Sequence, residues 1–177
     1  LALGKTCTRN CGFCDIDFSK NPIAPEEDEP ERIAYSVKEL GLKHVVITMV
    51  ARDDLSDGGA SAFSAILRAI REINPTVTIE VLTSDFEGSF DSLNAVLDER
   101  PEIFNHNIET VRELSGRVRH KASYDRTLEV LRFVASQKKA KFVKSGLMVG
   151  LGESKEQVQE TIKDLVQAGC EIITIGQ

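Results

Sequence analysis

Short apolar runs rich in β-branched residues alternate along the chain with longer segments whose apolar residues recur at helical spacing. Strands separated by helices pair in parallel, and the crossover between them is almost always right-handed. Six such units in a row predict an α/β fold, either an open doubly wound sheet or all or part of a β/α barrel. The predicted strands are Leu1–Gly4, as the end of a first strand, His44–Val50, Val77–Leu82, Ile103–Asn107, Phe142–Val149 and Ile172–Ile175.

Capping residues and apolar spacing predict five helices between these strands. A Ser-x-x-Gln capping box at Ser154 and Gln157 opens the last helix, and Gly169 closes it. The other helices are expected from Pro30 to Gly41, after Gly59, from Phe90 to Glu99 before Pro101, and around Leu128, Leu131 and Val134.

The length and charge of the chain narrow its class. At 177 residues and 41% hydrophobic content, the chain 1–177 is expected to form one domain. Its 22 basic and 28 acidic residues give a net charge of −6, so we expect no nucleic-acid partner and no attraction to anionic membranes. No apolar run approaches the roughly 20 residues that span a bilayer. We therefore expect a soluble protein with no membrane partner.

Polar residues gather where the predicted strands end. In parallel α/β folds this edge carries the functional site, because the variable loops there are held by a rigid sheet. Taken singly, Ser84 and Asp85 are typical of turns and helix caps. Asn105, His106 and Asn107 are different, since three polar side chains inside a predicted buried strand must each find partners. A functional site explains that segment better than a turn does.

Three of the four cysteines lie in one short loop, as Cys7-x3-Cys11-x2-Cys14, while Cys170 stands alone. This asymmetry favours a metal site in a reducing compartment over a disulfide framework. Three thiolates on a four-iron cube leave one iron open to bind something else. A closed zinc site needs a fourth ligand, from His or Cys170, and no nearby residue repeats the usual paired spacing. Cys170 is more typical of a small buried apolar residue.

With Phe13 before its last cysteine, this loop resembles the signature of the radical S-adenosylmethionine (SAM) superfamily. The resemblance implies a partial (β/α)6 TIM-like barrel as the radical SAM core. It also implies a [4Fe-4S] cluster on Cys7, Cys11 and Cys14, which would be catalytic through the cluster. In that superfamily the open iron binds the amino and carboxylate groups of SAM. An electron delivered through the cluster then cleaves SAM to methionine and a radical that abstracts hydrogen from unactivated carbon.

Other segments match the superfamily in the same order. The stretch Gly146–Glu153 resembles the fifth-strand segment whose backbone packs on the adenine, where glycine permits a close approach. Asn107 and Glu109 match positions that lie near the ribose and the substrate in biotin synthases, and Arg119 is carried over as a carboxylate partner. The implied cofactor-binding residues are Phe13, Asn107, Glu109, Arg119, Lys144, Ser145, Gly146, Met148, Gly150 and Glu153.

Within the superfamily, the chain resembles the lipoyl synthases from end to end. The matching stretches are Cys7–Asp15, Arg52–Gly59, Phe104–Thr110 and Lys144–Glu153, with local departures at Ser84 and His120. This resemblance implies insertion of two sulfur atoms into the octanoyl chain of a protein-bound octanoyl-lysine. Two alternatives stay open: another sulfur-inserting radical enzyme of the biotin-synthase type, and a non-catalytic metal-binding domain.

The resemblance also implies partners and a location. The substrate carrier would be an octanoylated lipoyl domain, from a 2-oxoacid dehydrogenase E2 or the glycine cleavage H protein, and the reductant a ferredoxin or flavodoxin. A second [4Fe-4S] cluster would be held by a cysteine motif before the barrel and a serine after it. Because the chain starts at Leu1 and stops at Gln177, we expect a central fragment without those ligands. We expect it in the cytoplasm, or in a mitochondrion or plastid of a eukaryote.

Overall fold

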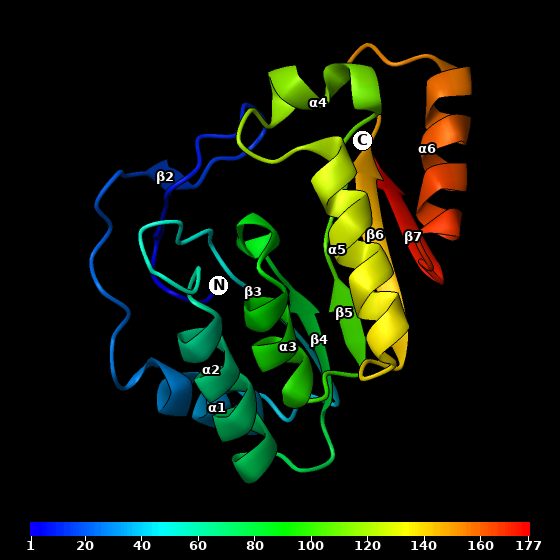
Figure 1. Ribbon diagram of the computed structural model, residues 1–177. Coiled ribbons are helices and arrows are strands. Elements are labelled where there is room, and N and C mark those ends of the chain that lie inside the picture. The colour runs from blue at the N-terminus through cyan, green and yellow to red at the C-terminus, as the bar shows by residue number, and fades with distance from the viewer.

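The computed structural model describes residues 1–177 and contains one sheet of five parallel strands (Figure 1). Each strand pairs with the next one along the chain, so that Val45 lies beside Ile79 and Val81 beside Phe104. A doubly wound sheet reverses its strand order at a switch point, whereas a barrel keeps the strands in chain order. The partial-barrel prediction is therefore confirmed. The strands are β3 (His44–Thr48), β4 (Thr78–Leu82), β5 (Ile103–Asn105), β6 (Phe142–Met148) and β7 (Ile172–Gly176).

The helices pack on one another in chain order, as the outer layer of a barrel requires. The main helices are α1 (Glu29–Glu39), α2 (Ala60–Ile73), α3 (Phe90–Asp98), α5 (Tyr124–Gln137) and α6 (Lys155–Gln167). Contacts run from α1 to α2, α2 to α3, α3 to α5 and α5 to α6. In Figure 1, α2, α3 and α5 lie in front of the sheet on the same side. None of the helices combines the length and apolar character needed to cross a bilayer.

Local sequence signals set the ends of these helices. At the start of α6, the Ser154 hydroxyl accepts a hydrogen bond from the Gln157 backbone N–H, and the Gln157 side chain accepts one from the Ser154 N–H. This is the predicted capping box. The helix ends where Gly169 adopts a φ of 91°, a conformation that glycine reaches without a steric penalty. The hydroxyl of Ser89 caps α3 in the same way as that of Ser154.

The core lies between the helices and the sheet. Helix α2 buries Phe63, Ile66 and Ile70, which share one face at helical spacing. Val81 of β4 and Phe104 of β5, which are paired in the sheet, belong to the same core and are fully buried. Burial of one such side chain is worth roughly 1.5–3 kcal/mol. This packing holds the strand ends in fixed positions, and the functional site is built on those ends.

Several predicted strands are shorter in the structure than expected. In the segment Leu1–Gly4 only Ala2 makes a bridge, to Met49 of the β3 edge, because Leu3 and Gly4 adopt φ values of 69° and 97° that no strand can continue. Strand β5 ends at Asn105 rather than Asn107, although the His106 N–H still donates to the Lys144 carbonyl oxygen of β6. The short helix α4 (Arg112–Val118) and the 3-10 turn η1 (Phe86–Gly88) were not predicted.

Candidate functional site

A cavity of about 210 Å³ lies where the cysteine loop meets the ends of β3, β4 and β5. Part of its wall is apolar and comes from the ends of β3 and β4 and the residues next to them, including Met49, Val50 and Leu82. Other parts of the wall are polar. Of the residues predicted for the site, the structure brings together seven in this wall: Cys7, Cys11, Phe13, Cys14, Asn107, Glu109 and Arg119.

The cysteine loop runs between two short parallel strands, β1 (Thr6–Cys7) and β2 (Asp17–Phe18). Backbone hydrogen bonds tie it to the barrel: Thr8 N–H donates to the Ala51 oxygen and Gly12 N–H to the Val118 oxygen, each at 3.0 Å. All the cysteines are free thiols; Cys7 and Cys11 are partly buried and Cys14 is exposed. Burial raises the pKa of the Cys11 thiol, and the positive charge of Arg119 opposes that rise.

The donor chemistry of this loop fits an iron–sulfur cluster better than a closed metal site. Soft thiolate ligands suit iron–sulfur clusters. No three His, Cys, Asp or Glu side chains of the chain gather around one point as in a closed tetrahedral site. Instead, the three thiols line a cavity whose wall also offers the polar groups of Asn107, Glu109 and Arg119. A cluster held by these thiols would share the cavity with these polar groups.

Glu109 and Arg119 place opposite charges in the cavity wall. The Arg119 guanidinium is buried and donates to the Asn107 carbonyl oxygen at 2.7 Å. Burial lowers the pKa of Arg119 and raises that of Glu109, and the attraction between the two groups counteracts both shifts. Such a pair can bind the carboxylate and the ammonium group of an amino-acid ligand at the same time.

Asn107 lies against Gly146 of β6. Its Oδ1 atom is buried and has no hydrogen-bond partner, which is unusual for a buried polar group and points to a missing ligand or water. A Cβ atom at position 146 would lie 2.8 Å from that oxygen and 2.9 Å from the Thr174 hydroxyl. Glycine at position 146 is therefore needed for the Asn107 side chain to lie across β6.

Several predicted cofactor residues lie outside the cavity wall and bind other parts of the protein. The Lys144 ammonium donates to Glu80 Oε1 at 2.8 Å, and Ser145 Oγ accepts from the Ile108 N–H at 3.1 Å. The Glu153 carboxylate accepts hydrogen bonds from two backbone N–H groups of its own loop. Cofactor contacts for these three residues, and for Gly146, Met148 and Gly150, stay predictions.

His106 also finds its partners within the protein. Its Nδ1 atom lies 2.9 Å from the Thr83 carbonyl oxygen, and its Nε2 atom lies 3.3 Å from the Thr127 hydroxyl. Burial, together with the charge of Arg119, lowers the pKa of His106 to about 4. The imidazole is therefore neutral near pH 7 and holds the cavity wall to β4 and α5 through hydrogen bonds.

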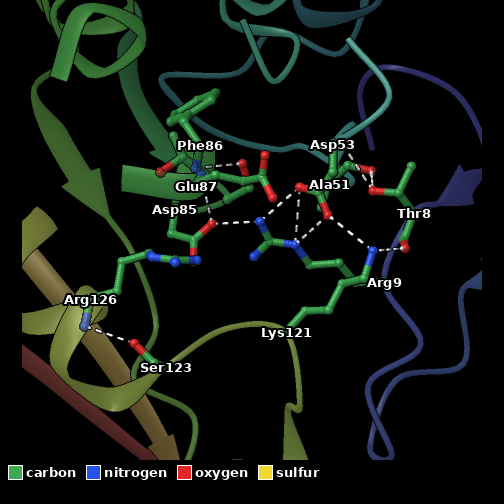
Figure 2. A network of polar contacts seen from close by, with 12 residues as sticks. Thr8, Arg9, Ala51, Asp53, Asp85, Phe86, Glu87, Lys121, Ser123 and Arg126 are labelled. Carbon is green, nitrogen blue, oxygen red and sulfur yellow. Dashed lines mark hydrogen bonds and ion pairs between the residues drawn. The ribbon is translucent and has the colours of Figure 1, made fainter. Parts of the chain in front are cut away.

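Arg9 was not among the predicted site residues, yet it forms the densest polar contacts of the region (Figure 2). Its guanidinium donates to both carboxylate oxygens of Asp53, at 2.9 and 2.7 Å, and to Asp85 Oδ1 at 2.6 Å. Burial alone would raise the pKa of Asp85, but Arg9 outweighs it and lowers that pKa to about 2. The sequence signal that could have identified Arg9 is an arginine between two cysteines together with an aspartate after each of two strands, Asp53 and Asp85.

The fold and the cavity together define a class of enzyme. The sequence profile of the Radical SAM superfamily matches residues 1–165, and the chain belongs to that superfamily. Membership implies an iron–sulfur cluster and SAM as cofactors. The barrel resembles that of HydG, a maturase of the [FeFe]-hydrogenase, with a TM-score of 0.79 at 14% identity over 99% of this chain and 41% of that one. Methylornithine synthase (PylB) gives 0.76 at 16% identity, covering 99% and 51%.

Among curated proteins, the chain is similar to lipoyl synthases. The enzyme of Protochlamydia amoebophila is 64% identical over 179 residues, which cover 100% of this chain and 55% of the relative. The enzyme of Chlamydia muridarum is 55% identical over 177 residues, covering 100% and 58%. The chain thus spans slightly more than half the length of these relatives. The resemblance to lipoyl synthases predicted from the motifs is confirmed along the whole chain.

Proposed function

We propose that this chain is the radical-generating barrel of a lipoyl synthase, with a [4Fe-4S] cluster on Cys7, Cys11 and Cys14 and with SAM in the adjoining cavity. The observation that carries the proposal is the cavity itself. Its wall contains three free thiols of the cysteine loop together with the charged side chains of Glu109 and Arg119 from the segments after β5. The identity with lipoyl synthases over the whole chain supports the assignment within the superfamily.

Each part of the wall has a distinct task in this proposal. The bound cluster and SAM supply the reductive cleavage that generates a hydrogen-abstracting carbon radical. Arg119 and Glu109 bind the carboxylate and the ammonium of the methionine portion and so orient it toward the thiols. The unpartnered Oδ1 of Asn107 accepts a hydrogen bond from a ligand hydroxyl or amine. The apolar residues Met49 and Leu82 exclude water and contact an acyl chain.

The complete reaction that we propose is the insertion of two sulfur atoms into a protein-bound octanoyl chain. It requires the longer protein, because the chain spans 55–58% of its curated relatives. In that protein a second [4Fe-4S] cluster would supply the sulfur, an octanoylated lipoyl domain of an E2 or H protein would carry the substrate, and a ferredoxin or flavodoxin would deliver electrons. The bacterial relatives support a cytoplasmic location.

The test is anaerobic reconstitution with iron and sulfide, followed by dithionite reduction in the presence of SAM. We expect visible iron–sulfur absorption and release of 5′-deoxyadenosine from the unchanged chain, and neither from a Cys11→Ala variant. A Cys170→Ala variant is the matched control, because Cys170 is buried far from the loop in sequence and does not line the cavity. Binding of colourless zinc in place of iron, or equal cleavage by the Cys11→Ala variant, would contradict the proposal.

A further inference from the structure

Arg9 lies between the first two cysteines, and its side chain leaves the loop to reach the ends of two neighbouring strands. It bonds to Asp53, which follows β3, and to Asp85, which follows β4 (Figure 2). The side chains of Arg9 and Asp85 are 7% and 0% exposed, whereas Asp53 is 11% exposed and also lies 3.8 Å from Lys121. The contact with Asp85 joins residues 76 positions apart. Arg9 therefore connects the cysteine loop to the ends of β3 and β4.

Asp85 is itself held from several directions. Its Oδ1 accepts from the Glu87 N–H at 3.1 Å in addition to Arg9, and its Oδ2 lies 3.5 Å from the Arg126 guanidinium of α5. The turn that carries it contains two non-glycine residues with positive φ, Phe86 at 46° and Glu87 at 53°. Backbone of this kind persists only where the surrounding contacts determine it fully. Asp85 is thus a fixed anchor for whatever binds it.

A buried ion pair is a poor device for stability alone. Removal of two charges from water is expensive, and apolar residues of similar volume often stabilise a fold better. The best-attested use of such pairs is to select one geometry among alternatives. Here the geometry that is selected is the position of the residues on either side of Arg9. Its own N–H contacts Cys7 Sγ at 3.4 Å, and Cys11 follows two residues later.

We propose that Arg9, anchored by Asp85 and supported by Asp53, is a positioning residue that fixes the cysteine loop so that its three thiols face the cavity. The proposal rests on the proposed function, because the thiols it positions are those assigned to the cluster. Backbone hydrogen bonds hold the loop to the barrel at Thr8 and at Gly12. The guanidinium of Arg9 adds a planar fork that binds Asp53 through two N–H groups and also donates to Asp85, a bidentate geometry that the ammonium of a lysine does not reproduce.

The test measures amide hydrogen exchange in the chain without a cluster, so that it depends on the loop alone. The reporters are the N–H groups of Thr8, Gly12 and Ser19, each bonded across or out of the loop. In Arg9→Gln we expect these amides to exchange roughly tenfold faster or more, while those of β4 and β5 keep their rates. Arg9→Lys retains contact with one carboxylate and should give an intermediate acceleration.

Arg68→Gln is the matched arginine control. Arg68 pairs with Glu99 on the outer helices and its side chain is 60% exposed, so its loss should leave the exchange of the loop unchanged. After reconstitution, the cluster of Arg9→Gln should also be lost to a chelator several-fold faster than that of Arg68→Gln. If Arg9→Gln does not fold, Arg9→Lys and Asp53→Asn decide, because each preserves part of the network.

The outcomes separate the two proposals. Loop exchange in Arg9→Gln at the unchanged rate would overturn the positioning role. If Arg9→Gln does not fold, unchanged loop exchange in both Arg9→Lys and Asp53→Asn would overturn the positioning role. A cluster that forms equally well in Cys11→Ala would instead overturn the proposed function, while the exchange data would still establish what holds the loop.

Discussion

A methyl group added at position 146 should destabilise the protein, although glycine in a strand is normally a weakness. In a strand, Gly→Ala stabilises by about 0.4–1 kcal/mol when the backbone and the space permit it, since the unfolded chain loses freedom. At Gly146 the new Cβ would lie 2.8 Å from Asn107 Oδ1 and 2.9 Å from the Thr174 hydroxyl. Overpacking of this kind costs about 1–3 kcal/mol. We expect Gly146→Ala to lose on the order of 1–2 kcal/mol of unfolding free energy.

Urea unfolding followed by circular dichroism measures this loss as a lower midpoint at constant slope. For a chain of this length, the loss corresponds to a fall in Tm of about 2–8 °C. The matched control is the pair of changes Gly146→Ala and Asn107→Ala, which removes one of the two clashing groups. Because the residues are in contact, the double variant should be more stable than the sum of the single effects predicts, by about 0.5 kcal/mol or more.

The close contact between Gly146 and Asn107 is refuted if Gly146→Ala is as stable as the unchanged protein. It is also refuted if the two changes are additive. Since Asn107 lies in the cavity wall, Gly146→Ala should also weaken SAM binding, and binding to the reconstituted protein by isothermal titration calorimetry measures that effect.

Three further predictions concern single residues. Arg9 lowers the pKa of Asp85 to about 2 in the folded state, so Asp85 should contribute about 2 kcal/mol to the free energy of unfolding above about pH 4. This contribution should be lost as the pH falls toward about 2. Urea unfolding midpoints across this pH range, compared with those of Asp85→Asn, measure the loss. An Asp85→Asn variant with the same acid dependence as the unchanged protein would contradict the assignment. Ser154→Ala removes the capping box of α6 and should cost about 1 kcal/mol in the same assay, whereas no loss would mean that the cap is not formed in solution. Burial raises the pKa of the Cys170 thiol to about 12, so iodoacetamide near pH 8 should label exposed Cys14 but not Cys170. Mass spectrometry of the labelled protein measures both sites, and equal labelling in the folded protein would contradict the expectation.

Much of the fold follows from local sequence patterns. The capping box at Ser154 and the turn at Gly169 predict the limits of α6, because capping depends on residues within one turn of the helix end. Strand order does not follow from such patterns, and only the pairing of β3 through β7 selects the barrel. The first predicted strand was too long, because the positive φ of Leu3 that ends it leaves no signal in the amino-acid composition.

The candidate site was also partly predictable, because part of it is encoded in a local sequence pattern. Cysteine spacing is a local pattern, and it located the loop that lines the cavity. Arg9 was missed because its partners lie 44 and 76 positions away, and an isolated arginine in a sequence does not reveal them. The predicted cofactor contact of Lys144 stays a prediction, and the motif did not reveal its bond to Glu80, a residue 64 positions earlier. Long-range partners of charged side chains are the part that sequence reasoning reaches least.

The chain-order pairing of the strands also bears on how the protein is made. Every pairing from β3 to β7 closes only one strand–helix unit, so this sheet can grow stepwise as the chain leaves the ribosome. The cysteine loop is different, because its contacts with Asp85 and with Lys121 span 76 and 113 positions. We expect this segment, which comes before the sheet in the sequence, to be the last to become protected. Pulse-labelled hydrogen exchange during refolding would show this as late protection of Gly12, and early protection would disprove it. If the loop holds a cluster as proposed, that cluster would be inserted into a barrel that is already ordered.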